Sequence, residues 1–138
     1  MSNNNVVLLL GSNLGDPKKN LQEAKKQIQK HIGPILKESQ ILETRPVEFA
    51  SSNNFHNFAL VTSTSLSPMA LLKTIKTIEY AMGRKRDSAS LGGYTDRLID
   101  IDIVRYSGLV YASPTLKIPH RKHCFEREFS KILLKELD

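Results

Sequence analysis

The stretch Arg97-Leu98-Ile99-Asp100-Ile101-Asp102-Ile103-Val104 decides the fold and already indicates a chemistry. Its aliphatic, mostly β-branched residues favour a β-strand. Successive side chains of a strand point to opposite faces, so the two aspartates share one face and the three isoleucines share the other. The isoleucine face predicts a strand that covers a hydrophobic core.

The opposite face carries two carboxylates, which a strand would place roughly 6–7 Å apart. Two charges that close repel each other, and both are costly to bury unless a positive group lies between them. Mg²⁺ suits this position because it binds carboxylate, water and phosphate oxygens. The alternative is an edge strand whose polar face meets water, and a D-x-D motif alone is too short to choose between them.

The composition, 40% hydrophobic and 25% charged, is typical of a globular protein, and 138 residues predict a single domain, 1–138. No apolar run approaches the ~18 residues of a membrane span, and the N-terminus lacks the features of a signal peptide. The single Cys124 cannot form an intrachain disulfide. We therefore expect a cytoplasmic protein. The net charge of +6 predicts an anionic partner: nucleic acid, a nucleotide or phosphate.

Apolar periodicity and turn residues predict the order of the elements. Asp16-Pro17 and Ser67-Pro68 each combine an N-cap residue with a proline at the first helical position, and Gly33 and Gly83 are typical helix stops. The patterns predict strands over 6–10, 35–44, 55–65 and 97–104, helices over 17–32, 68–82 and 120–137, and a short strand or hairpin over 108–113.

This β-α-β-β-α-β order predicts an α+β fold, the ferredoxin-like sandwich, with both central helices on one face of an antiparallel sheet. In that topology we expect the first strand and the aspartate strand to lie side by side in the centre. The loops 45–54 and 84–96 would then flank the carboxylates. Arg84 and Arg86 could clamp phosphate there; the alternative is a solvated basic loop.

Several motifs occur in an order that is specific in combination. They are Gly11-Ser12-Asn13-Leu14-Gly15, Thr44-Arg45-Pro46, Phe55-x-Asn57, Ile78-Glu79-x-x-Met82-Gly83-Arg84-x-Arg86, Arg97-Leu98-Ile99-Asp100-Ile101-Asp102 and Ile118-Pro119-His120. From about Val6 to about Leu134 the chain resembles the 6-hydroxymethyl-7,8-dihydropterin pyrophosphokinases of folate biosynthesis.

The resemblance implies a ferredoxin-like fold and transfer of pyrophosphate from ATP to the hydroxymethyl oxygen of the pterin, with release of AMP. It implies that Asp100 and Asp102 hold two Mg²⁺ ions and act in catalysis with Arg84 and Arg86. The ATP contacts that it implies are Glu79, Arg84, Arg86, Arg97, Ile101, His120 and Arg127. The pterin contacts are Thr44, Val47, Phe55, Asn57, Asp100 and Phe129. Partners would be these two substrates, with no nucleic acid and no membrane, and the chain would be a monomer.

Three of these residues have plainer alternative roles. Glu79 could be an exposed helix residue, and His120 a surface histidine after a proline. Phe129 also fits the apolar stripe of the last helix, which consists of Phe125, Phe129, Ile132 and Leu133, although its ring and that of Phe55 could sandwich a flat pterin.

The sequence departs from the family pattern in three places. Arg127 and Phe129 follow His120 one residue later than expected, which a one-residue insertion explains. The loop 87–96 lacks the tryptophan of some relatives, so closure over the site could differ. The chain stops at Asp138, where many relatives continue for another ~20 residues, a tail that we expect to be peripheral to the core.

Two other classes of protein share parts of the pattern. A Mg²⁺-dependent nucleotidyltransferase also pairs Gly-Ser with D-x-D, but there the two motifs lie close together, whereas Gly11-Ser12 and Asp100 are far apart here. An RNA-recognition-like module has the same element order and often a basic surface. It needs two or three aromatic residues on its exposed sheet face, and the predicted first strand, 6–10, has none.

Overall fold

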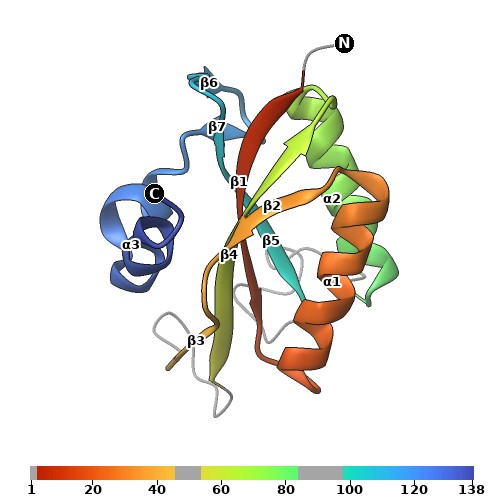
Figure 1. Cartoon of the computed structure of the whole chain (residues 1–138), viewed down its shortest axis with the longest axis vertical. Coiled ribbons are helices and arrows are strands. Elements are labelled where there is room, and N and C mark those ends of the chain that lie inside the picture. Colours follow the sequence, from red (N-terminus) through yellow and green to blue (C-terminus); the bar gives the residue numbers. More distant parts are fainter. Residues whose placement is uncertain (1–2, 46–53, 84–97) are drawn as a thin grey trace.

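The computed structural model describes residues 3–45, 54–83 and 98–138. One antiparallel sheet forms the middle layer, with helices α1 (Pro17–His31) and α2 (Pro68–Ala81) on one face and α3 (Glu128–Lys135) on the other (Figure 1). No helix in these described ranges is long and apolar enough to cross a membrane.

The strands of the sheet are β1 (Asn4–Ser12), β2 (Ile35–Glu38), β3 (Leu42–Thr44), β4 (Phe55–Thr64) and β5 (Asp100–Tyr106). Their order is β2-β4-β1-β5, and β3 also pairs with β4. The fold class is therefore the predicted ferredoxin-like α+β sandwich. The aspartate strand β5 does lie beside β1, but within the described residues it forms the edge of the sheet, so its predicted central position is wrong. The central strands are β1 and β4, because β1 pairs with both β4 and β5.

Both long helices begin where the sequence predicts. The Asp16 carboxylate accepts a hydrogen bond from the Lys19 amide, and the Ser67 hydroxyl accepts one from the Ala70 amide. Each cap satisfies a backbone donor that the first helical turn leaves without a partner. The apolar stripes of α1 and α2 then pack on the sheet. The fully buried members of these stripes include Leu21, Ala24, Ile28, Leu71 and Ile75.

Strand β1 is buried on both faces, as its continuous apolar run predicts. Leu8 and Leu10 face the core under α1 and α2, whereas Leu9 faces a smaller core under α3. Strand β5 has the same alternation: Ile101 and Ile103 join the first core and Val104 joins the second. Asp100 and Asp102 therefore point toward the α3 side, opposite to the two long helices.

The segment 35–44 forms two strands, not the single strand predicted. Ser39 interrupts it: the Ser39 amide donates to the Ala59 carbonyl at 2.8 Å, and the Ser39 hydroxyl accepts from the Ala59 amide at 2.9 Å. The next residue, Gln40, is held by the Glu136 carboxylate through both its amide groups, each at 3.0 Å. A side chain thus replaces a backbone partner and the ladder breaks.

The last segment is also more broken than the predicted single helix over 120–137. A π-helical turn, η2 (Lys122–Glu126), precedes α3, and Phe125, a member of the predicted apolar stripe, is 66% exposed. Leu133 of the predicted stripe is buried, whereas Ile132 is exposed and Leu134 is buried in its place. The short strand or hairpin predicted over 108–113 is confirmed in part: β6 (Tyr111–Ala112) lies in this range, but it pairs with β7 (Lys117–Ile118), which lies beyond it.

Gly33 allows the segment between α1 and β2 to pass close to the backbone of β4. A Cβ at this position would lie 1.8 Å from the Ser63 carbonyl oxygen, a backbone atom that cannot move independently. We expect Gly33→Ala to lower the free energy of unfolding by about 3 kcal/mol, the upper range for overpacking. Gly108→Ala is the matched control because a Cβ at that position would have no atom within 4 Å. Urea denaturation of both variants would test this, and equal midpoints would contradict it.

Candidate active site

The outer edge of β5 is closed by side chains and a loop within the described residues. The Ile101 amide donates to the Glu79 carboxylate at 2.8 Å, and the Val104 carbonyl accepts from the His120 amide at 2.9 Å. Glu79 is 2% exposed, so the alternative of an exposed helix residue is wrong. Because backbone donors and acceptors at a sheet edge need partners, these two contacts fix β5 against α2 and the segment after β7.

A cleft of about 570 Å³ lies along this edge. Five residues predicted from sequence line it: Asp100, Ile101, Asp102, His120 and Arg127. Four further cationic side chains, which the sequence did not single out, line the same cleft: Lys76, Lys117, Arg121 and Lys122. Two carboxylates among so many cationic groups suit a metal ion bound together with a polyanion.

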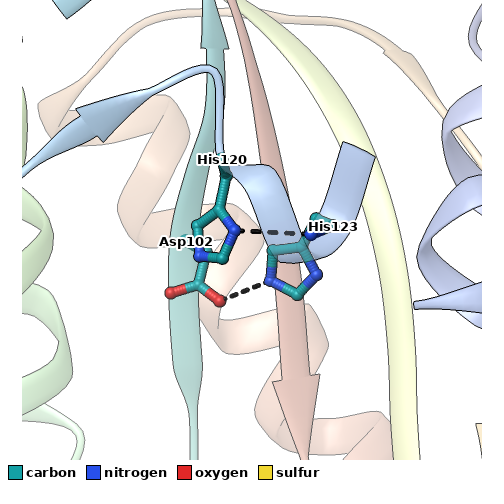
Figure 2. Close-up of side chains that lie close together, drawn as sticks. All are labelled: Asp102, His120 and His123. Carbon is teal, nitrogen blue, oxygen red and sulfur yellow. Dashed lines mark hydrogen bonds and ion pairs between the residues drawn. The ribbon is translucent and has the colours of Figure 1, made fainter. Parts of the chain in front are cut away.

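Asp102 is held from one side by a buried histidine. Its side chain is 30% exposed, and its Oδ2 lies 2.7 Å from Nε2 of His123 (Figure 2). Burial acts to raise the pKa of the Asp102 carboxyl, but the hydrogen bond with His123, together with the neighbouring basic side chains, outweighs it and holds the pKa below its usual value. Asp102 is therefore an acceptor-only carboxylate at neutral pH.

His120 sits beside this pair, with its ring centroid 4.2 Å from that of His123. Burial, followed by the neighbouring His123, lowers the pKa of His120. Its Nδ1 accepts a long hydrogen bond, 3.4 Å, from the His123 amide (Figure 2). The histidine of the Pro-His motif is thus half-buried in the cleft wall, not a surface histidine.

Asp100 and Asp102 fit a magnesium ion in donor chemistry and placement. Both carboxylates are partly exposed on the same face of β5 and line the cleft. Figure 2 shows the second Asp102 oxygen pointing away from His123. Asp102, His120 and His123 also have possible ligand atoms within 4.8 Å of one another, but Mg²⁺ prefers oxygen ligands. The hard carboxylate oxygens are thus the atoms that would hold it.

A row across three strands connects the carboxylates to the predicted pterin residues. Gly11 of β1 pairs with Asn57 of β4 on one side and with Asp100 of β5 on the other. Directly paired residues place their side chains on the same face of a sheet. The Asn57 amide and the Asp100 carboxylate therefore lie on either side of Gly11, which has no side chain. A Cβ on Gly11 would lie 2.6 Å from Asn57 Oδ1.

The remaining described pterin residues gather at the same end of β4. Phe55 pairs with Thr44 of β3, and Asn57 Nδ2 donates to the Thr44 hydroxyl at 3.3 Å. Phe129 of α3 packs against the core on this face, with its ring 6.3 Å from that of His123 in an edge-to-face arrangement. Phe129 therefore does contribute to the apolar packing of α3, while it stays on the side of the sheet that carries the aspartates.

Four predicted residues lie outside the described ranges: Val47, Arg84, Arg86 and Arg97. Two residues of the site, His123 and its buried partner Ser130, were not predicted from the sequence. The spacing His120-x-x-His123 was the available signal, since residues three apart on a helical turn share a face. The missing information was that this face meets Asp102.

Together, the fold and the cleft define an enzyme class: a ferredoxin-like sheet whose edge strand presents paired carboxylates to a cationic cleft suits phosphoryl-group transfer. The family model of 7,8-dihydro-6-hydroxymethylpterin-pyrophosphokinase (HPPK) matches residues 7–138. The chain belongs to this family.

Named relatives agree with this assignment. The chain is 37% identical over 135 residues to the 2-amino-4-hydroxy-6-hydroxymethyldihydropteridine pyrophosphokinase of Porphyromonas gingivalis, covering 96% of this chain and 89% of the relative. The chain is also 37% identical to the enzyme of the same name from Aquifex aeolicus, and this match covers 83% of this chain and 69% of the relative. The predicted reaction, pyrophosphoryl transfer from ATP to hydroxymethyldihydropterin in folate biosynthesis, is thereby confirmed in preference to the nucleotidyltransferase and RNA-binding alternatives.

Longer relatives contain the same unit. The folic acid synthesis protein FOL1 of Dictyostelium discoideum is 38% identical over 135 residues, and the match covers 98% of this chain but 20% of that protein. The wild-type HPPK-DHPS structure of Plasmodium falciparum has a TM-score of 0.73 at 16% identity, covering 98% of this chain and 41% of that one. The structural match supports the fold.

Proposed function

We propose that the face of β5 toward α3 is where this chain transfers pyrophosphate, with Asp100 and Asp102 holding two Mg²⁺ ions, ATP in the edge cleft and the pterin over Gly11. The row Asn57–Gly11–Asp100 carries the proposal, because it places an amide that can read the pterin edge two strand spacings, roughly 10 Å, from a metal-binding carboxylate. A pterin held by Asn57 would direct its hydroxymethyl group toward β5.

The reaction balances as a single displacement. The hydroxymethyl oxygen forms a bond to the β-phosphorus of ATP, the bond from that phosphorus to the α,β-bridging oxygen breaks, AMP leaves, and the hydroxyl proton passes to water. When bound, the metal ions would neutralise phosphate charge and orient the phosphates. Asp100 and Asp102 would hold the metal ions at the sheet edge, and Asn57 and the ring of Phe55 would orient the pterin that accepts the pyrophosphate.

The cleft supplies the nucleotide contacts. Ile101 gives the cleft an apolar wall, while Arg127, His120 and Lys117 place positive or hydrogen-bonding groups around it. Glu79 supports this wall, because its carboxylate holds the Ile101 amide; its contact with ATP is proposed on the family resemblance. The arginines Arg84, Arg86 and Arg97 are proposed as further phosphate contacts on the family resemblance.

Product analysis tests the proposed function. The protein is mixed with Mg²⁺-ATP and 6-hydroxymethyl-7,8-dihydropterin, and nucleotides and pterins are separated and quantified. We expect AMP and pterin diphosphate in equal amounts, and only when both the pterin and the metal are present. Release of inorganic pyrophosphate with a nucleotidylated pterin, or AMP formation without pterin, would contradict the proposal.

The Gly11 position gives a test of the pterin pocket. Gly11→Ala would push the Asn57 side chain away from its bond to Thr44, because the new Cβ would lie 2.6 Å from Asn57 Oδ1. We expect KM for the pterin to rise about tenfold, the equivalent of one displaced hydrogen bond, with little change in KM for ATP. Gly108→Ala serves as the control. Steady-state kinetics with each substrate varied would measure both KM values. A rise in KM for ATP alone would contradict the placement of the pterin over Gly11.

A further inference from the structure

A buried chain of three side chains connects α3 to the aspartate strand. Nδ1 of His123 lies 2.7 Å from the Ser130 hydroxyl oxygen, and Nε2 lies 2.7 Å from Asp102 Oδ2. His123 is 1% exposed and Ser130 is 0% exposed. Neither is among the residues that the family resemblance implies, and neither contacts a substrate in the proposed function.

The direction of these hydrogen bonds follows from the chemistry of the groups. The ionised Asp102 carboxylate can only accept, so Nε2 of His123 must donate the proton between them. In a neutral imidazole the other nitrogen is then an acceptor. The Ser130 hydroxyl is the group within reach of Nδ1, and by donating to it Ser130 selects the tautomer that carries its proton on Nε2.

The π-helical turn explains how His123 reaches this position. The Arg127 amide donates to the Lys122 carbonyl at 2.8 Å, which encloses one residue more than an α-helical turn. This turn therefore accommodates the one-residue offset of Arg127 and Phe129 from the family spacing. Within it, His123 is buried against β5 while Phe125 is 66% exposed.

We propose that His123 is a positioning residue for the metal ligand Asp102, and that Ser130 fixes its tautomer. His123 occupies Oδ2, so Asp102 presents its other oxygen to the metal from one orientation instead of rotating between several. The proposal rests on the role assigned to Asp102 in the proposed function. Hydrogen-bonded partners of metal ligands typically change metal affinity about 10- to 100-fold, and we expect an effect of this size.

The test measures how much Mg²⁺ strengthens nucleotide binding. Calorimetry gives the affinity of the full chain for α,β-methylene-ATP, which cannot undergo the cleavage, with and without Mg²⁺. The ratio of the affinity with Mg²⁺ to the affinity without it is the metal-linked gain. If His123 had a purely structural role, its substitution would lower both affinities together and leave this gain unchanged. We expect His123→Leu to reduce this gain at least about tenfold, and His123→Gln, whose amide can still donate to Asp102, to retain most of it.

Three further variants make the outcome decisive. Ser130→Ala should reduce the metal-linked gain, but by less than His123→Leu does. If His123→Leu fails to fold, Ser130→Ala is the deciding variant, and a wild-type gain in it would overturn the proposal. His31→Gln, on the exposed end of α1, is the matched control and should keep the full gain. If Asp102→Asn loses the gain and folded His123→Leu keeps it, the positioning role is wrong. If Asp102→Asn itself keeps the gain, the metal assignment of the proposed function fails, and the positioning role with it.

Discussion

Asp100→Asn and Asp102→Asn are each expected to lower kcat by about 10³-fold, the upper range for removing one group that stabilises transition-state charge. The amide keeps the shape of the side chain but loses the negative charge that binds a hard cation. The fold should persist, since both side chains are partly exposed and the amide oxygen of Asp102→Asn can still accept a hydrogen bond from His123. Turnover measured as AMP release, together with circular dichroism, would check both parts.

The control for these variants is Asp16→Asn. It makes the same chemical change at an exposed N-cap, where asparagine caps as well as aspartate, so activity and stability should stay near wild type. Near-normal turnover in both Asp100→Asn and Asp102→Asn would contradict the two-carboxylate site. Loss of turnover in Asp16→Asn as well would show that the effect is not specific to β5.

Glu79→Leu is expected to produce the second large effect, on stability and on the cleft together. It leaves the Ile101 amide without its acceptor at a buried position, which costs about 3 kcal/mol for a bond to a charged group. Since Ile101 forms a wall of the cleft, KM for ATP should also rise. Denaturant unfolding gives the first quantity and steady-state kinetics the second.

Glu79→Gln separates the hydrogen bond from the charge. The glutamine carbonyl can still accept from Ile101, so most of the stability should return. A loss in Glu79→Gln as large as in Glu79→Leu would mean that the carboxylate charge matters beyond this bond, for example through Lys76, whose Nζ lies 3.7 Å from Glu79 Oε1.

Local signals were enough to predict most of the fold. The cap-and-proline pairs at Asp16 and Ser67 fix the helix starts, because they depend on residues adjacent in sequence. The continuous apolar run in β1 and the alternation in β5 report burial directly. The same alternation placed Asp100 and Asp102 together on the face opposite to Ile101 and Ile103, which is where they lie.

The parts that the sequence did not predict depend on contacts between distant residues. Ser39 ends β2 through bonds to Ala59, twenty residues away, and the burial of Glu79 follows from α2 packing beside the edge of β5. His123 looks like an ordinary helix residue until α3 brings Ser130 to one side of it and β5 brings Asp102 to the other. No local pattern contains these partners.

A crystal structure of the chain with Mg²⁺, α,β-methylene-ATP and 6-hydroxymethyl-7,8-dihydropterin would test the proposed site most directly. We predict two metal ions at about 2.1 Å from oxygens of Asp100 and Asp102, the triphosphate along the edge cleft, and the pterin over Gly11 beside Asn57. His123 should still be bonded to the other Asp102 oxygen. Metal ions bound away from both aspartates, or a pterin on the α1/α2 face of the sheet, would contradict it.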